Sequence, residues 1–144
     1  MDKNKKKSIP RLIMGIGHHL KIRLDKKLSE DNLTISQFRV LAYLWEYGEQ
    51  RINQKMIHEF LEIKPSSLTK LIKILESKGL IRKEIDPHDS RNKTIKLTEQ
   101  GIEIKELCLQ RIAESEAYIL QDFSEKEILT LKELLLRIKK KIRH

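Results

Sequence analysis

The stretch ESKGLIRKEIDPHDSRNKTIKLTEQG, residues 76–101, decides the fold. Two runs with alternating apolar residues, at 81–85 and 94–97, predict two short β-strands. Eight polar residues separate the runs, so the strands can pair as one antiparallel hairpin. Gly79 ends a helix just before the hairpin, because glycine adopts the left-handed conformation that closes many helices. Thr98 begins another helix just after it. The stretch therefore predicts a β-hairpin that lies between two helices.

Two short helices precede the hairpin. The segment NQKMIHEFLEI starts at Asn53, the segment KPSSLTKLIKILESKGL starts at Lys64, and both carry apolar residues at helical spacing. Only residues 62–65 join them, and two helices with so tight a turn predict a helix-turn-helix. Because a hairpin follows directly, we expect a winged helix-turn-helix. In such a motif the second helix enters the major groove of DNA.

The second of these helices has a polar face opposite its apolar stripe. Serine and threonine hydroxyls can bond bases or phosphates, lysine suits phosphate or guanine, and the free N–H groups at the helix start can hold a phosphate. The alternative is the solvated face of an ordinary amphipathic helix, but the short turn and the basic hairpin favour DNA. The candidate DNA-binding residues on this face are Ser66, Ser67, Thr69, Lys70 and Lys73.

Charge is distributed in blocks along the chain. Residues 64–96 carry nine basic and four acidic side chains, whereas residues 99–133 carry four basic and nine acidic ones. A polyanion would be attracted to the first block and repelled from the second. The C-terminus is basic again, through Arg137, Lys139, Lys140, Lys141 and Arg143.

Helices are also expected on both sides of this motif. Ser8 and Pro10 can start a first helix, a capping box of Thr34 and Gln37 starts a second, and Ser124 starts the last. The first and last helices each carry an apolar stripe that a single winged-helix core does not need, which predicts a homodimer. Mutual packing of the two stripes within one chain is the alternative. The stripes are Ile9, Leu12, Ile13 and Ile16, and Leu131, Leu134, Leu135, Ile138 and Ile142.

The overall composition agrees with a soluble, mainly helical protein. The 144 residues are 39% hydrophobic and 35% charged, with a net charge of +9, which favours an anionic partner such as nucleic acid. Cys108 is the only cysteine, so no disulfide can form within the chain, as is usual in a reducing cytosol. The basic N-terminus, residues 1–7, is expected to be disordered. It lacks the apolar segment of a signal peptide, and no run is long enough to span a bilayer. We therefore expect a cytoplasmic protein without a membrane partner.

The same residues 76–101 resemble the MarR (multiple antibiotic resistance regulator) family of bacterial transcription factors. The shared features are GLI after the glycine-closed helix, Asp89-Ser90-Arg91 in the hairpin, and LTEQG at 97–101; LTISQFRVL, which starts at Leu33, resembles the family's second helix. The resemblance implies one domain over 1–144 that is mainly α with a small antiparallel β-hairpin. It comprises a winged helix-turn-helix lobe at 34–97 and N- and C-terminal dimerisation helices at 8–30 and 102–142.

The resemblance also implies a function and residue roles. MarR-like homodimers bind pseudo-palindromic double-stranded DNA, most often as repressors. Arg91 would enter a minor groove, which attracts arginine most strongly where it is narrow and A·T-rich. Asp89 would hold Arg91 by a charge-assisted hydrogen bond, and Asn92 and Lys93 would contact phosphates. Many relatives hold small anionic or aromatic effectors, for which the candidate residues here are His19, Arg23 and Trp45.

Other functions have weaker support in the sequence. Asp86, His88 and Asp89 crowd the hairpin tip, but they lack the ordered Cys or His spacing of a zinc site. We expect neither a metal nor a cofactor. Cys108 lies among apolar residues and is expected to be a buried, unreactive thiol. No phosphate loop or nucleophile with its base is present, so an enzyme is not expected. The remaining alternative is a winged helix that binds a protein or acts as an architectural module.

Overall fold

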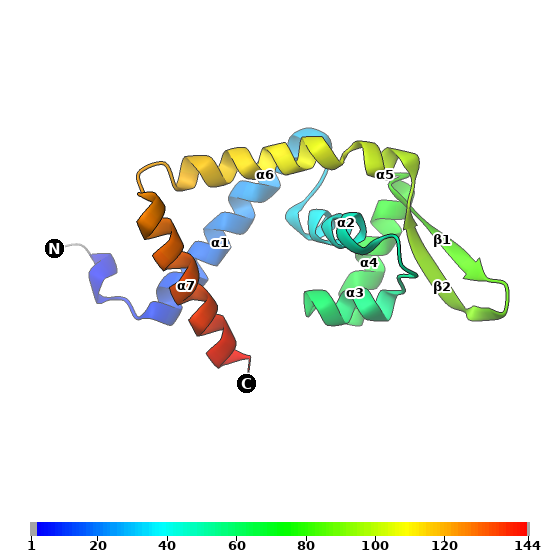
Figure 1. The fold of residues 1–144 in the computed structure, drawn as a ribbon, viewed down its shortest axis with the longest axis horizontal. Coiled ribbons are helices and arrows are strands. Elements are labelled where there is room, and N and C mark those ends of the chain that lie inside the picture. The colour runs from blue at the N-terminus through cyan, green and yellow to red at the C-terminus, as the bar shows by residue number, and fades with distance from the viewer. Residues whose placement is uncertain (1–2, 144) are drawn as a thin grey trace.

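The computed structural model describes residues 3–143 as helices with one small β-sheet (Figure 1). The expected fold class, mainly α with an antiparallel hairpin, is confirmed. No helix within the described residues is both long enough and apolar enough to cross a membrane. In chain order the elements are α1 (Ile9–Leu28), α2 (Ile35–Tyr47), α3 (Gln54–Leu61), α4 (Pro65–Ser77), β1 (Ile81–Asp86), β2 (Asp89–Leu97), α5 (Glu99–Glu103), α6 (Lys105–Ile119) and α7 (Glu125–Ile142), with 3-10 turns at Lys3–Lys6 and Ser29–Asp31.

The elements form a compact lobe and two extended helices, α1 and α7, which we call the arms. In Figure 1 the lobe, α2 to β2, lies on one side, α1 and α7 lie on the other, and α6 runs along the top between them. Most of the buried apolar side chains belong to the lobe, so its packing holds α4 and the hairpin against α2 and α3. The core includes Val40, Leu41, Leu44, Ile52, Ile57, Leu68, Ile72, Leu75, Leu80, Ile81 and Ile95.

Side-chain caps determine where the helices begin. Ser8, Asn53 and Thr98 each accept a hydrogen bond from a backbone N–H in the first turn of the helix that follows. Thr34 and Ser124 form complete capping boxes with the glutamine or glutamate three residues later. Each cap satisfies N–H groups that have no partner within the helix, at about 1 kcal/mol per cap. The boundaries predicted from these residues agree with the structure to within about one residue.

The hairpin is longer than the sequence pattern predicted. The second strand starts at Asp89 rather than at residue 94, so only Pro87 and His88 remain in the turn. Polar residues continue the strand because backbone pairing does not depend on alternation in an exposed ribbon. The pairing is regular from Ile81↔Leu97 to Ile85↔Lys93 and then shifts, with Asp86 opposite Asp89. This irregularity leaves residues 90–92 as an extra segment at the tip of the wing.

The sequence after Thr98 predicts one long helix over 98–123, but the structure interrupts it at Ile104, between α5 and α6. The carbonyl of Gly101, which in a continuous helix accepts the N–H of Lys105, accepts the indole N–H of Trp45 at 2.9 Å. A side chain that enters the hydrogen-bond ladder in this way bends a helix. The helix also ends at Ile119, four residues before the expected end.

Two other expectations were wrong. The N-terminal segment was expected to be disordered, yet Lys3–Lys6 form a 3-10 turn, which a hydrogen bond from Lys7 N–H to Asn4 O extends. Residues 1 and 2 of that segment lie outside the described residues. The helical spacing of the apolar residues in 53–63 predicts that Phe60 faces the core, but Phe60 is 58% exposed. Its ring instead packs beside Tyr43 and Tyr47, with centroid distances of 4.9 and 5.6 Å.

We predict that Gly101→Ala destabilises the lobe. A Cβ at this position would lie 2.1 Å from the carbonyl oxygen of Leu80, so the junction between α4, the hairpin and α5 must move apart. The expected loss is about 1–3 kcal/mol in the free energy of unfolding, as for other overpacked sites, measured by urea denaturation. The matched control is Gly17→Ala on α1, where a Cβ meets nothing within 4 Å. Equal stabilities of the two variants would contradict this reading of Gly101.

Candidate nucleic-acid interface

The helix α4 presents the polar face that the sequence predicted. Ser66, Ser67, Lys70 and Lys73 are exposed, whereas Leu68, Ile72 and Leu75 on the opposite face are buried in the lobe. Thr69 is different, since it is half-buried and its hydroxyl donates to Pro65 O at 3.0 Å. The same hydroxyl accepts the side-chain N–H of Gln54 at 3.3 Å. Four of the five candidates are therefore open to a ligand, while Thr69 ties α4 to the start of α3.

The first turn of α4 is also open. No side chain caps it: Lys64 occupies the cap position without a side-chain hydrogen bond, and Pro65 stands at the first helical position. A helix start of this kind offers backbone N–H groups and the positive end of the helix dipole to an anion. Ser66 and Ser67 place two hydroxyls beside it. This end of α4 is chemically suited to a phosphate of a nucleic-acid backbone.

The tip of the wing projects Arg91 into solvent. Its side chain is 96% exposed, and its backbone N–H donates to Asp89 Oδ1 at 3.0 Å. The guanidinium Nε lies 3.9 Å from the same oxygen, which is an ion pair but too long for a hydrogen bond. Asp89 therefore shapes the backbone at the tip more firmly than it holds the guanidinium. Asn92 and Lys93 beside Arg91 are exposed as well.

The turn of the wing is braced by charges that the sequence reasoning missed. Arg51 lies 3.4 Å from Asp86, whose other oxygen accepts the N–H of His88 at 2.8 Å. The backbone next to Arg51 joins the hairpin, since Ile95 N–H donates to Ile52 O at 2.8 Å. Asp86 and His88 thus serve the geometry of the turn. Arg51, with its side chain 82% exposed, adds a cation to this edge of the lobe.

Further along the hairpin, Glu84 stands between two cations. Hydrogen bonds from Lys96 and Arg82 lower the pKa of its carboxyl group, and burial raises it only partly back. Glu84 therefore stays ionised and neutralises part of the positive charge on the wing. Toward the tip, Lys93 and the almost fully exposed Arg91 carry the positive charge that is most open to solvent.

A group of ion pairs joins α6 to α1 and to the turn that leads from α1 into the lobe. Arg111 on α6 contacts Asp31 at 3.1 Å and Glu30 at 3.0 Å, in the turn between α1 and α2. The hydrogen bond with Asp31 is the main reason why the pKa of Arg111 is raised. One turn further along α6, Glu114 pairs with Lys27 of α1 at 3.1 Å. These contacts fix the direction in which α6 leaves the lobe.

Cys108 is buried beside this group, as expected, and burial raises the pKa of its thiol to about 11. We predict that the thiol does not react with a disulfide reagent in the native protein at pH 8. Only about one molecule in a thousand would carry the thiolate at that pH, and no reagent can reach the buried sulfur. Full reaction is expected in urea. If Cys108 in the folded protein reacted with the reagent as fast as free cysteine does, the prediction would be contradicted.

The three candidate effector residues do not lie together. His19 and Arg23 line a groove of about 490 Å³ on α1, with Lys7 and Arg11 also along it. Arg23 donates to Ser115 Oγ at 3.1 Å, and its guanidinium lies 4.4 Å from the centre of the Tyr118 ring. Trp45 lies in the lobe, where it packs edge-to-face on Phe38 and donates to Gly101. The structure therefore brings His19 and Arg23 together but not Trp45.

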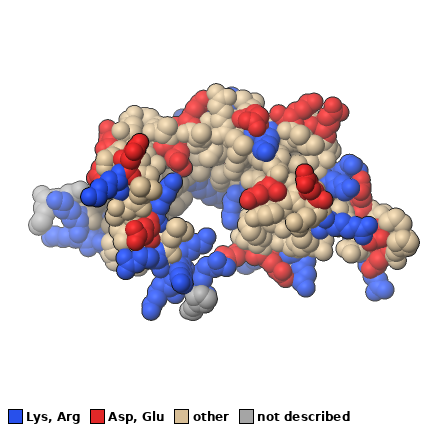
Figure 2. All heavy atoms as spheres, in the orientation of Figure 1, with Lys and Arg blue, Asp and Glu red and all other residues tan. Residues whose placement is uncertain are grey.

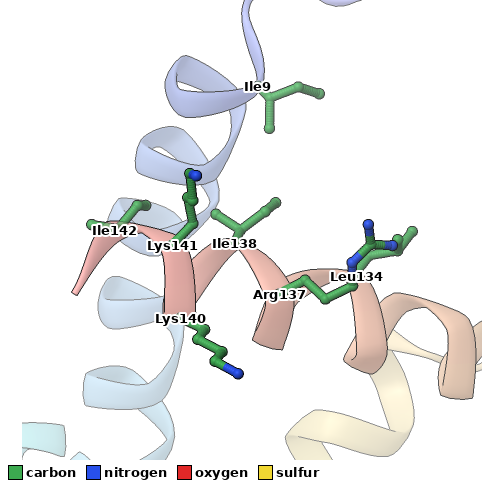
Figure 3. Close-up of a pocket in the computed structure, with 7 residues that line it drawn as sticks. All are labelled: Ile9, Leu134, Arg137, Ile138, Lys140, Lys141 and Ile142. Carbon is green, nitrogen blue, oxygen red and sulfur yellow. The ribbon is translucent and has the colours of Figure 1, made fainter. Parts of the chain in front are cut away.

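The arms expose a large apolar surface. Leu131, Leu134 and Leu135 of α7 are 39–45% exposed, and Ile9 and Ile16 of α1 are 58–59% exposed. Figure 3 shows a groove of about 930 Å³ between the start of α1 and the end of α7, with Ile138 and Lys141 pointing to the side of Ile9 and Lys140 pointing away. A second groove, about 450 Å³ in volume, runs between α1, α6 and α7 and is almost wholly apolar.

The tight turn between two packed helices, the open polar face of α4 and the basic wing tip define a winged helix-turn-helix protein of the DNA-binding class. The apolar helices α1 and α7 flank the lobe, so the protein is a winged helix-turn-helix protein with additional helices at both ends.

Comparison with known proteins assigns the family. Residues 24–107 match the family model Transcriptional regulator SarA/Rot. The chain is 34% identical to the regulator PecS of Dickeya dadantii over 81% of this chain and 71% of that protein. It is 30% identical to the multiple antibiotic resistance protein MarR of Salmonella typhimurium, over 89% and 88%. Two further relatives are spanned only to about half of their length, 52%.

The solved structures agree. The S. aureus MepR–DNA complex superposes with a TM-score of 0.87 at 27% identity, over 95% of this chain and 99% of that one. The chain therefore belongs to the MarR family of winged helix-turn-helix transcriptional regulators, and the resemblance of residues 76–101 is confirmed.

Proposed function

We propose that the protein is a homodimeric repressor that binds a pseudo-palindromic site in double-stranded DNA. The observation that carries the proposal is the pairing of two exposed features in one lobe: the polar first turns of α4, and Arg91 at the tip of the wing. The first suits base edges and phosphates in a major groove, and the second suits an adjacent minor groove. Asn92, Lys93, Lys70 and Lys73 would add contacts to the backbone.

The apolar arms supply the dimer in this proposal. Side chains such as Leu135 and Ile16 are too exposed for the arms to be satisfied within one chain, and a continuous apolar surface of this kind is typical of a subunit interface. A two-fold axis through the arms would present two α4 helices to DNA. The half-sites would then lie about one helical turn apart, roughly 34 Å.

Regulation by a small anionic or aromatic effector is part of the same proposal. His19 and Arg23 share a groove with Arg11 of α1 and with Lys7 just before it, which supports a site for an anion. Trp45 is the weaker candidate, since its indole N–H already has a partner in the lobe. Bound ligand would act by favouring a dimer whose α4 helices are wrongly spaced for the operator.

Fluorescence anisotropy tests the DNA-binding proposal. Duplexes of about 30 base pairs are first selected by the protein from a random-sequence library, and binding is then measured against salt. We expect tight binding to a two-fold symmetric sequence and a steep loss of affinity between 50 and 200 mM salt, roughly 10³-fold or more. Failure to select any sequence would overturn the proposal. A selected site without symmetry would favour an architectural or protein-binding role.

A further inference from the structure

The C-terminal end of α7 lies beside the turn that leads into the DNA-reading helix. Arg143, just after α7, makes an ion pair with Glu62 at 2.9 Å. Glu62 ends α3 in the left-handed conformation and stands three residues before Pro65, where α4 begins. Four residues of chain cannot place Ser66 more than about 15 Å from Glu62. The helix α7, which runs back from the far end of α6 (Figure 1), thus ends at the turn before α4.

This end of α7 is strongly basic. Residues 134–143 contain five lysine or arginine side chains and no carboxylate. Figure 2 shows basic side chains gathered around the end of α7, at the lower edge of the molecule in that view. Among the described residues, the pairing with Glu62 is the only ion pair that engages any of the five, so four positive charges remain for an external anion. The five are Arg137, Lys139, Lys140, Lys141 and Arg143.

The cations do not all face the same way. The apolar stripe of α7 passes through Leu131, Leu135, Ile138 and Ile142, at helical spacing. Lys139, Lys140 and Arg143 lie off this stripe and together line a groove of about 430 Å³, and Arg143 makes the contact with the lobe. Lys140 also lines the groove of Figure 3, where its side chain points to the side opposite Ile9. A second copy that covers the stripe would therefore leave this side of the helix open.

We propose that Lys139 and Lys140, beside the ion pair of Arg143 with Glu62, form an additional DNA contact, which binds backbone phosphates in the centre of the operator, between the two half-sites. This inference rests on the proposed function, because it needs a dimer that places two α4 helices on one duplex. Lysine side chains suit phosphates as mobile point charges. The ion pair of Arg143 with Glu62 positions the two lysines, and the exposed helix start of α4 is the neighbouring phosphate site.

The alternative occupant is the acidic block of a second copy, at residues 99–133. The observations favour DNA for two reasons. Lys139 and Lys140 lie off the apolar stripe that a second copy would cover, and Arg143 beside them is paired with Glu62 in the turn that leads into α4. Basic residues in the last turn of a helix also interact favourably with the helix dipole. That interaction does not explain why Arg143 pairs with Glu62 of the lobe.

The test compares two double variants on the duplex selected by the wild-type protein. In Lys139→Gln/Lys140→Gln, four lysines per dimer are lost. We expect the slope of log affinity against log salt to become shallower by roughly 2 to 4, and affinity near 0.1 M salt to fall roughly tenfold or more. The control, Lys21→Gln/Lys126→Gln, removes the same charge from exposed sites on α1 and at the start of α7. It should change the slope much less.

Hydroxyl-radical footprinting locates the contact. The wild-type protein should protect the centre of the duplex as well as both half-sites, and the Lys139/Lys140 variant should lose only the central protection. An unchanged slope, or equal changes in the two variants, would overturn the inference while wild-type binding upholds the proposed function. A variant that dissociates to monomers in sedimentation would assign the lysines to the partner subunit and also overturn it. If the wild type selects no duplex, the proposed function itself fails.

Discussion

Replacing Arg91 by alanine should weaken operator binding by roughly 5- to 100-fold, equivalent to about 1–3 kcal/mol, without any change in the dimer or in thermal stability. Arg91 is 96% exposed and contributes nothing to the core, so its removal leaves the fold intact. What is lost is a cation in a minor groove, where the phosphates of both strands concentrate negative potential. Anisotropy measures the affinity, and sedimentation together with thermal unfolding checks the protein.

A second arginine in the same hairpin provides the control. Arg82 on β1 is exposed and shares Glu84 with Lys96, so Arg82→Ala removes equal charge without opening the wing. We expect it to cost much less affinity than Arg91→Ala. Equal losses would mean that the wing acts only through its total charge, and an unchanged affinity in Arg91→Ala would reject a DNA contact by the wing.

Substitutions of Asp89 separate its two contacts with Arg91. Asparagine keeps an oxygen that can accept the backbone N–H of Arg91 but removes the ion pair with its guanidinium. Because the backbone bond is 3.0 Å and the ion pair 3.9 Å, Asp89→Asn should weaken binding less than Asp89→Ala. The reverse order would mean that the carboxylate charge positions Arg91.

Local signals made much of this architecture predictable. Caps such as Asn53 and Thr34 act within one helical turn, so three or four residues of sequence suffice to place a helix start. The alternation at 81–85 predicts a strand because side chains on a ribbon face opposite sides. Arg91 could be singled out because it stands at a hairpin tip next to an aspartate, and a resemblance to a known family then suggested its role.

The features that were missed depend on contacts between residues distant in the sequence. The break at Ile104 follows from Trp45, which reaches across 56 positions to the carbonyl of Gly101. Phe60 has the spacing of a core residue, but it packs on rings of α2 at the edge of the lobe. In the sequence, Arg111 cannot be distinguished from the other basic residues. Its role follows only from the fold, which brings Glu30 and Asp31 into contact with it. No local pattern contains these partners.

The basic end of α7 shows the same limit for the candidate site. Its charges were evident in the sequence, and a polyanion was the natural partner, but nothing local placed them near α4. The ion pair between Arg143 and Glu62, 81 residues apart, supplies that information. Charge content is a property of a segment, whereas a binding site is a property of the surface that several segments form together.

Replacing Leu135 by glutamate should dissociate the dimer. Leu135 is 45% exposed in one chain and lines the apolar groove between α1, α6 and α7, where a second copy would bury it. A carboxylate buried without a partner costs about 3–5 kcal/mol, and the two-fold axis introduces two of them. We expect the dimer dissociation constant to rise at least about 100-fold, and operator affinity to fall with it, because a monomer reaches only one half-site. Sedimentation equilibrium measures the first effect and anisotropy the second.

The matched control is Leu129→Glu, the same change on the same helix. Leu129 is 68% exposed and lies opposite the apolar stripe of α7, so a second copy that covers the stripe leaves it in water. It should dimerise and bind DNA as the wild type does. Because Leu135 is not buried within one chain, Leu135→Glu should keep the secondary structure of the folded monomer, which circular dichroism checks. A Leu135→Glu protein that remains dimeric would place the interface elsewhere, and the arms would then need another partner to cover their apolar surface.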